Sequence, residues 1–141
     1  MSPAERDLDR LLAALEPRLR PGGYVFTRVA APPAGVRPVV TVAEDEALTV
    51  VCAQDEADAA GLPYDYVAAW ITLRVHSALD AVGLTHAVSG ALAEAGLPCN
   101  VVAGYHHDHL FVPAAEGPRA VGLLRALADR AAAAAPGEAG R

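Results

Sequence analysis

Lysine is absent from this 141-residue chain, whose eleven basic residues are all arginine and are spread from Arg6 to Arg141 without a dense cluster. Proteins that bind nucleic acid usually carry a basic stripe that neutralises phosphates. This chain instead has a formal net charge of −6. The sequence therefore disfavours nucleic acid as a partner.

Cysteine and long hydrophobic runs are also scarce. Cys52 and Cys99 each lie in an apolar stretch and form no C-x-x-C pair, which is typical of buried thiols in a reducing compartment. No apolar run approaches the roughly 18 residues that span a bilayer. The charged N-terminal segment lacks the apolar core of a signal peptide. We therefore expect a cytoplasmic protein that does not enter a membrane.

Catalytic signatures are missing as well. The chain contains no G-x-S-x-G nucleophile elbow and no glycine-rich phosphate-binding loop. His76 and Ser77 are adjacent on an expected strand, so their side chains diverge. The sequence thus predicts a protein that is not an enzyme and that uses no cofactor.

Apolar residues make up 53% of the chain, enough for one domain or for two small ones that share a core. In the N-terminal half, the spacing of leucines predicts a helix from Glu5 to Leu19, which Pro17 would kink or end early. Pro38 favours an edge position for the strand that follows it. The strands expected here are Tyr24–Val29, Val39–Val42 and Ala47–Ala53, with a short helix at Glu56–Gly61.

The C-terminal half has a sharper pattern. It predicts a half-buried strand from Trp70, a helix that ends at Gly96, buried strands at Cys99–Gly104 and Leu110–Val112, and a last helix around Val121–Ala128. These are five of the six elements of a ferredoxin-like βαββαβ unit. The sixth, a strand, would come from the N-terminal half. We expect an α+β fold of two intertwined ferredoxin-like units, with antiparallel sheets covered by helices on one face.

The segment ITLRVHSALDAVGLTHAVSGALAEAGLPCNVVAGYHHDHLFVP resembles the ACT domains of small stand-alone bacterial proteins and the regulatory half of aspartate kinases. Three features carry the resemblance: Val82-Gly83-Leu84 at a helix start, Cys99-Asn100-Val101 at the head of the next strand, and a tight turn before Leu110-Phe111-Val112. The N-terminal half, with GGYVFTRV and ALTVVCAQDEA, resembles the accompanying half of the same proteins. The expected divisions are an N-terminal ACT-like half at 1–68, a C-terminal ACT domain at 69–130 and a disordered tail at 131–141.

The resemblance implies a regulatory module that binds a small molecule, an amino acid, at a domain or subunit interface, and that forms a homodimer. A strand leading into a helix start leaves free N–H groups that suit a carboxylate. Gly83 lets the backbone approach a ligand, and Asn100 offers both a donor and an acceptor. The expected ligand-binding residues are Ser77, Leu79, Asp80, Val82, Gly83, Leu84, Asn100 and Val101.

The same residues also have a purely structural explanation. Asp80 or Ser77 would cap the helix, Gly83 would permit packing, and Asn100 would fix a turn. The loop also departs from the common ACT pattern, in which Asp and Pro come just before the Gly. Here Asp80 lies three residues ahead of Gly83, and Val82 stands where proline is frequent.

Two other functions stay open. His106, His107, Asp108 and His109 are residue types that bind zinc, although consecutive residues of an extended chain point to opposite faces. The sequence favours the simpler explanation, a polar turn in which one histidine pairs with Asp108. The second alternative is that the chain binds no ligand and is a module for protein–protein interaction or dimerisation.

Overall fold

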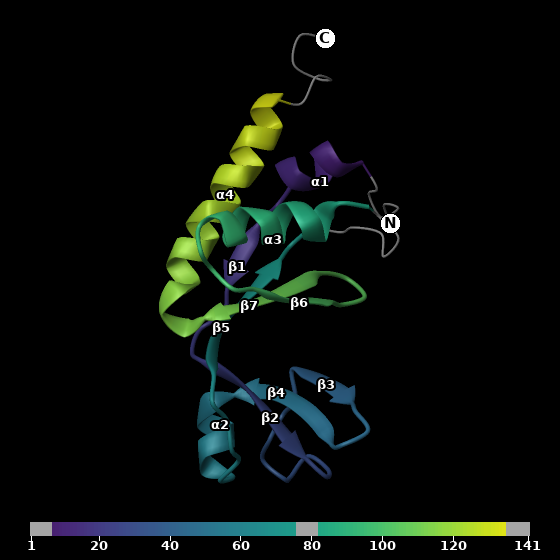
Figure 1. Ribbon diagram of the computed structural model, residues 1–141, viewed down its shortest axis with the longest axis vertical. Helices are drawn as coiled ribbons and strands as arrows, with labels where there is room; N and C mark the ends of the chain where they lie inside the picture. The colour runs from purple at the N-terminus through teal and green to yellow at the C-terminus, as the bar shows by residue number, and fades with distance from the viewer. Residues whose placement is uncertain (1–6, 76–81, 135–141) are drawn as a thin grey trace.

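The computed structural model describes residues 7–75 and 82–134 (Figure 1). Its strands form one antiparallel sheet in the order β3-β4-β2-β5-β7-β6, and a seventh strand, β1, also pairs with β5. The strands are β1 Pro17–Leu19, β2 Tyr24–Val29, β3 Val40–Ala43, β4 Leu48–Ala53, β5 Val67–Leu73, β6 Asn100–Ala103 and β7 Asp108–Pro113. The α-helices are α1 Leu8–Ala13, α2 Gln54–Ala59, α3 Leu84–Glu94 and α4 Gly117–Ala134, and a short 3-10 helix covers Ala114–Glu116.

Strand β5 joins two ferredoxin-like units. Its first residues pair with β2, where Ala68 lies opposite Tyr24, and its last residues pair with β1, where Ile71 lies opposite Leu19. On its other side β5 pairs with β7 along six residues. We call β2, β3, β4 and α2 the N-terminal unit, and β1, β6, β7, α1, α3 and α4 the C-terminal unit. The sixth element of the C-terminal unit is therefore β1, which confirms that the N-terminal half supplies it.

The helices cover one face of the sheet. In the C-terminal unit, α1, α3 and α4 pack on β5 and β7 (Figure 1). The fully buried side chains of this core include Leu11, Ile71, Leu92, Leu110 and Leu124. In the N-terminal unit, α2 places Ala57 in a smaller core with Val25, Val50 and Cys52. These contacts confirm the predicted α+β fold with helices on one face.

The opposite face of the sheet carries aromatic side chains instead of helices, and we call it the helix-free face. Phe111, Val51 and Ala68 are buried there, and Tyr24, Phe26 and Trp70 pack around them while remaining partly exposed. The Tyr24 and Trp70 rings meet edge to face with centroids 5.1 Å apart. Phe26 meets Phe111 in the same way at 5.5 Å. This face therefore presents an aromatic surface built from both units.

The helix expected from Glu5 to Leu19 was wrong at its C-terminal end. It stops at Ala13, and Pro17–Leu19 form β1 instead. Proline cannot donate the hydrogen bond that a helix interior requires. Leu19 continues the helical spacing of the preceding leucines. The segment Pro17–Leu19 nevertheless forms a strand, because it pairs with the end of β5.

Three further boundaries differ from the expectation. The strand expected as buried at Cys99–Gly104 is the edge strand β6, with exposed Asn100 and Ala103 at its ends. The turn after it covers Gly104–His107, so Asp108 and His109 already belong to β7. Helix α4 continues to Ala134, four residues into the expected tail; residues 135–141 lie outside the described chain.

None of the helices described in 7–75 and 82–134 is long and apolar enough to cross a bilayer.

Candidate functional site

The loop predicted to bind a ligand lies only partly within the described residues, since Ser77, Leu79 and Asp80 fall outside them. Val82 is 82% exposed, whereas Leu84 is buried in the core of the C-terminal unit. Gly83 is the N-cap residue of α3 with a left-handed backbone (φ 97°), and as a glycine it supplies no side-chain cap. A Cβ at Gly83 would lie 3.1 Å from Leu8 Cδ2. Glycine at this position therefore has a structural reason, because both its backbone angle and its contact with Leu8 require it.

The other half of the predicted site is remote from that loop. Asn100 begins β6 opposite Phe111 and is exposed, while Val101 packs against the helix-covered core. Helix α3 has 11 residues and is about 16 Å long. Gly83 lies at its start and Asn100 follows its end. Within one chain the structure does not bring Gly83 and Asn100 together.

A cavity of about 510 Å³ opens on the helix-free face where the two units meet, and we call it the junction cavity. Its volume falls in the range of small-molecule sites. The N-terminal unit supplies most of its wall, and β5 and β7 supply the rest. The lining residues are Tyr24, Arg37, Pro38, Val39, Val40, Ala53, Glu56, Trp70 and His109.

A hydrogen-bonded group of side chains forms the wall on the side of β5 and β7. Trp70 Nε1 donates to His109 Nδ1 at 3.1 Å, and Thr72 Oγ1 lies 3.2 Å from the same nitrogen. Arg20 Nε donates to Thr72 Oγ1 at 3.1 Å, and the Arg20 guanidinium lies 4.5 Å from the centre of the Trp70 ring. These bonds hold the indole and the imidazole in fixed positions at the cavity.

The same bonds define the protonation state of His109. Because Nδ1 accepts the Trp70 N–H, the ring proton of the neutral imidazole is on Nε2. Burial, followed by the positive charge of Arg20 and by His107, lowers the pKa of His109. His109 is therefore neutral near pH 7, and the positive charge on this side of the cavity comes from Arg20, behind the Trp70 ring.

The opposite wall carries one charge of each sign. Glu56 Oε1 accepts the backbone N–H of Arg37 at 2.7 Å. Within the described part of the chain, the Arg37 guanidinium makes no hydrogen bond or ion pair, and Glu56 forms no ion pair. The cavity thus combines an available carboxylate and an available guanidinium with the aromatic surfaces of Tyr24 and Trp70.

The histidine turn lacks the geometry of a metal site. No group of three or more His, Cys, Asp or Glu side chains is placed to hold a metal ion among residues 7–75 and 82–134. His109 already engages Trp70 and Thr72. Burial raises the pKa of Asp108, and this effect outweighs the opposing influence of His107. His109 of β7 therefore lines the junction cavity, where Trp70 and Thr72 engage its Nδ1.

The junction cavity could not be found from the sequence. The sequence predicts strands at Tyr24 and at Trp70, but these residues lie 46 positions apart in the chain. Arg37 was in a proline-rich connection and Glu56 in a short helix, with no motif that linked either to the aromatic residues. Only the pairing of β2 with β5, together with the curl of the sheet, brings these side chains to one cavity.

The C-terminal unit, counted with the shared strand β5, has the six elements of a βαββαβ fold, and the N-terminal unit packs one helix on its strands, so the chain is a tandem of ferredoxin-like units. The comparison with protein families also finds two domains. Two ACT-domain family models match the chain, one at residues 3–69 and the other at residues 66–126. The chain belongs to the ACT-domain family and is a tandem-ACT protein. ACT domains are ligand-binding regulatory modules.

Solved structures support this assignment. A protein of unknown function from Vibrio cholerae is 40% identical, with a TM-score of 0.77, covering 86% of this chain and 95% of that one. A protein from Agrobacterium tumefaciens is 24% identical, with a TM-score of 0.60 and coverage of 81% and 89%. The ligand-free regulatory subunit of aspartate kinase from Thermus thermophilus shares the fold at 10% identity, with a TM-score of 0.61 and coverage of 81% and 97%. No curated protein sequence matches the chain significantly.

Proposed function

We propose that this protein is a regulatory module that binds an amino acid in the junction cavity and has no catalytic activity of its own. One observation carries the proposal: a cavity at the junction of two ACT units holds one available carboxylate, one available guanidinium and an aromatic surface. These three features are complementary to the ammonium group, the carboxylate and the side chain of an amino acid.

In the proposed complex, Glu56 faces the ligand's ammonium group and Arg37 faces its carboxylate. An apolar or aromatic ligand side chain packs against Tyr24 and Trp70. Such a ligand contacts both units at once. It therefore favours the arrangement of the units in which both walls of the junction cavity can contact it. A ligand shifts a conformational equilibrium only through different affinities for the two states, and a site that spans two units provides this difference.

The loop at 77–84 stays a second proposed site. It would use the start of α3, where the N-cap residue is the glycine Gly83. Because Asn100 is a helix length away in the same chain, a second copy of the protein would have to supply Asn100 and Val101. This second site therefore depends on a homodimer, whereas the junction cavity is complete within one chain.

Thermal-shift measurements against the twenty amino acids, with titration of tryptophan fluorescence, test the proposal. A ligand at one hundred times its Kd stabilises the native state by about 2.7 kcal/mol, a shift of several degrees for a domain of this size. Trp70 is the only tryptophan and lines the cavity, so a bound ligand should change its emission. We expect a selective response to one or two amino acids.

Substitutions identify the site that responds. Glu56→Gln and Arg37→Gln should abolish the response, while Asp55→Asn, at an exposed acid of the same helix, should preserve it. Loss of the response in Asn100→Ala, with Glu56→Gln unaffected, would move the ligand to the loop at 77–84. A complete lack of response to all twenty amino acids would contradict amino-acid binding and favour a ligand-free interaction module.

A further inference from the structure

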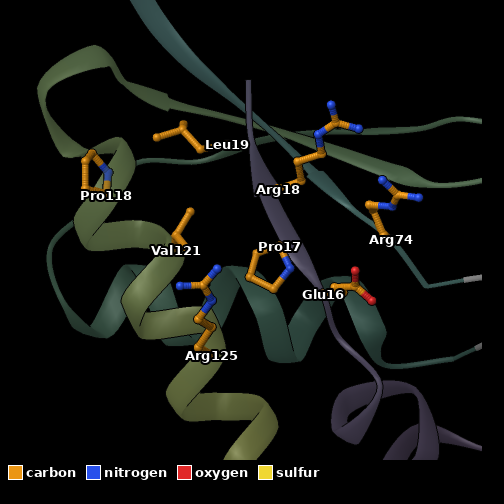
Figure 2. A pocket seen from close by; sticks show the side chains of 8 residues that line it. All are labelled: Glu16, Pro17, Arg18, Leu19, Arg74, Pro118, Val121 and Arg125. Carbon is orange, nitrogen blue, oxygen red and sulfur yellow. The ribbon is translucent and has the colours of Figure 1, made fainter. Parts of the chain in front are cut away.

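A second cavity, of about 470 Å³, lies between β1 and α4 and has no lining residue in common with the junction cavity (Figure 2). We call it the β1 cavity. Its apolar surface comes from Pro17, Leu19, Pro118 and Val121. Its charged residues are Arg18, Arg74, Arg125 and Glu16, so three positive charges face one negative charge.

The three arginines of the β1 cavity are available for a ligand. None of Arg18, Arg74 and Arg125 makes a side-chain hydrogen bond or an ion pair with the described part of the chain. Other arginines of the protein are engaged: Arg20 bonds to Thr72, and Arg119 bonds to the Ala95 carbonyl. The charged residues that line the β1 cavity sum to +2, whereas the whole chain carries −6. A local concentration of one charge in a hollow attracts ions of the opposite charge.

The backbone of β1 adds a donor to this cavity. Arg20 N–H donates to the Trp70 carbonyl, and Arg74 N–H donates to the Glu16 carbonyl. The backbone N–H and C=O groups of the even-numbered residues in and beside β1 therefore point toward β5. In an antiparallel pair the alternate residues direct their N–H and C=O groups away from the partner strand. Those residues are Pro17 and Leu19, and proline has no N–H. Leu19 N–H is therefore the outward-facing donor of β1.

The arginines flank the strand on both sides. Figure 2 shows Arg125 reaching from α4 on one side of β1, with Arg18 and Arg74 on the other side. Arg18 and Arg74 share a face because Arg18 lies opposite Thr72, two residues before Arg74. A ligand with a single negative group cannot meet both sets of guanidinium groups. One with two or more negative groups can reach across the open edge of the strand.

The edge of β1 is poorly suited to the addition of another strand. It has three residues, one of which is proline, and a second copy paired with it would bring a further Arg18 to the same edge. Short length, proline and like charges are features that protect sheet edges from strand addition. The volume of the cavity is instead that of a small-molecule site.

We propose that the β1 cavity binds a compact anion that carries at least two carboxylate or phosphate groups. Arg125 contacts one anionic group, Arg18 and Arg74 contact the other, and Leu19 N–H contributes a hydrogen bond. The apolar surface of Pro17 and Val121 contacts the carbon backbone of the ligand. This site is separate from the junction cavity and does not depend on amino-acid binding there.

Isothermal titration with citrate, succinate and acetate at equal, low ionic strength tests the proposal. We expect saturable binding of citrate and weaker binding of succinate, with none for acetate. Titration with pyrophosphate, which carries two phosphate groups, then separates phosphate from carboxylate recognition. Raising the salt from about 20 to about 200 mM should weaken citrate binding, because exposed charges are screened beyond about 10 Å.

Arginine substitutions supply the decisive comparison. Arg18→Gln, Arg74→Gln and Arg125→Gln should each weaken citrate binding about threefold, as expected for exposed ion pairs, and the triple variant at least about tenfold. The control is Arg28→Gln, at an exposed arginine of β2 outside the cavity. Circular dichroism checks that each variant is folded.

Three results would overturn the proposal. They are the absence of saturable citrate binding to the wild-type protein, unchanged binding in a folded triple variant, and an equal loss in Arg28→Gln, which would indicate diffuse attraction to the whole surface. The junction variant Glu56→Gln should bind citrate normally. If it did not, the two cavities would not be separate sites. Failure of the citrate experiment leaves the amino-acid response unchanged, so the two proposals fail independently.

Discussion

The substitution Leu11→Ala tests whether the N-terminal helix belongs to the core of the C-terminal unit. Leu11 is completely buried in the cluster that includes Leu92, Leu110 and Leu124. Alanine removes three carbon atoms from this core and leaves a cavity that the surrounding helices and strands fill only in part. Such replacements cost about 3–5 kcal/mol. This is a large fraction of the 5–15 kcal/mol by which most domains are stable.

Urea unfolding followed by tryptophan fluorescence measures this loss. Trp70 is the only tryptophan and is packed on the helix-free face, so its emission reports on the folded sheet. With a slope of about 2 kcal/mol per molar urea, the midpoint should fall by about 1.5–2.5 M. The control Val42→Ala, at a side chain 49% exposed on an edge strand, should change stability by less than about 0.5 kcal/mol. A loss below about 1 kcal/mol in Leu11→Ala would refute the packing of α1 on this core.

Three other outcomes follow from the structure. Gly83→Ala should lower stability by about 1–2 kcal/mol in thermal unfolding, because φ is positive there and a Cβ would press on Leu8; an unchanged melting temperature would contradict this backbone geometry. Because the folded state lowers the pKa of His109, the unfolded chain takes up a proton first as the pH falls below about 6.5, and stability should decrease by at most about 1.4 kcal/mol per pH unit. His109→Gln should remove that part of the pH dependence, and a pH profile identical to that of the wild type would count against it. Burial raises the pKa of the Cys99 thiol to about 11, so alkylation of native protein at pH 7.5 should be at least about tenfold slower than that of an exposed thiol; rapid modification would show that the thiol is accessible.

The amino-acid sequence by itself determined the fold class and most of the elements. Alternating apolar residues in Tyr24–Val29 and leucines at helical spacing after Gly83 specify a strand and a helix through local periodicity, which needs no distant partner. Gly96, with φ 80°, follows α3 as the sequence predicted. The resemblance to ACT domains also came from contiguous segments, and both family models confirm it.

Long-range pairing decided the rest. Leu19 has the spacing of a helical residue, yet it lies in a strand because β5 offers hydrogen bonds to the segment from Pro17. The loop and Asn100 were expected to form one site, but their separation follows from the length and direction of α3, which a list of motif residues does not contain. The same holds for the two cavities, whose walls come from residues that are far apart in the chain. The local sequence determines which residues lie on the same face of a helix or strand. Only the packing of the whole sheet determines which of these faces and which strand edges come together.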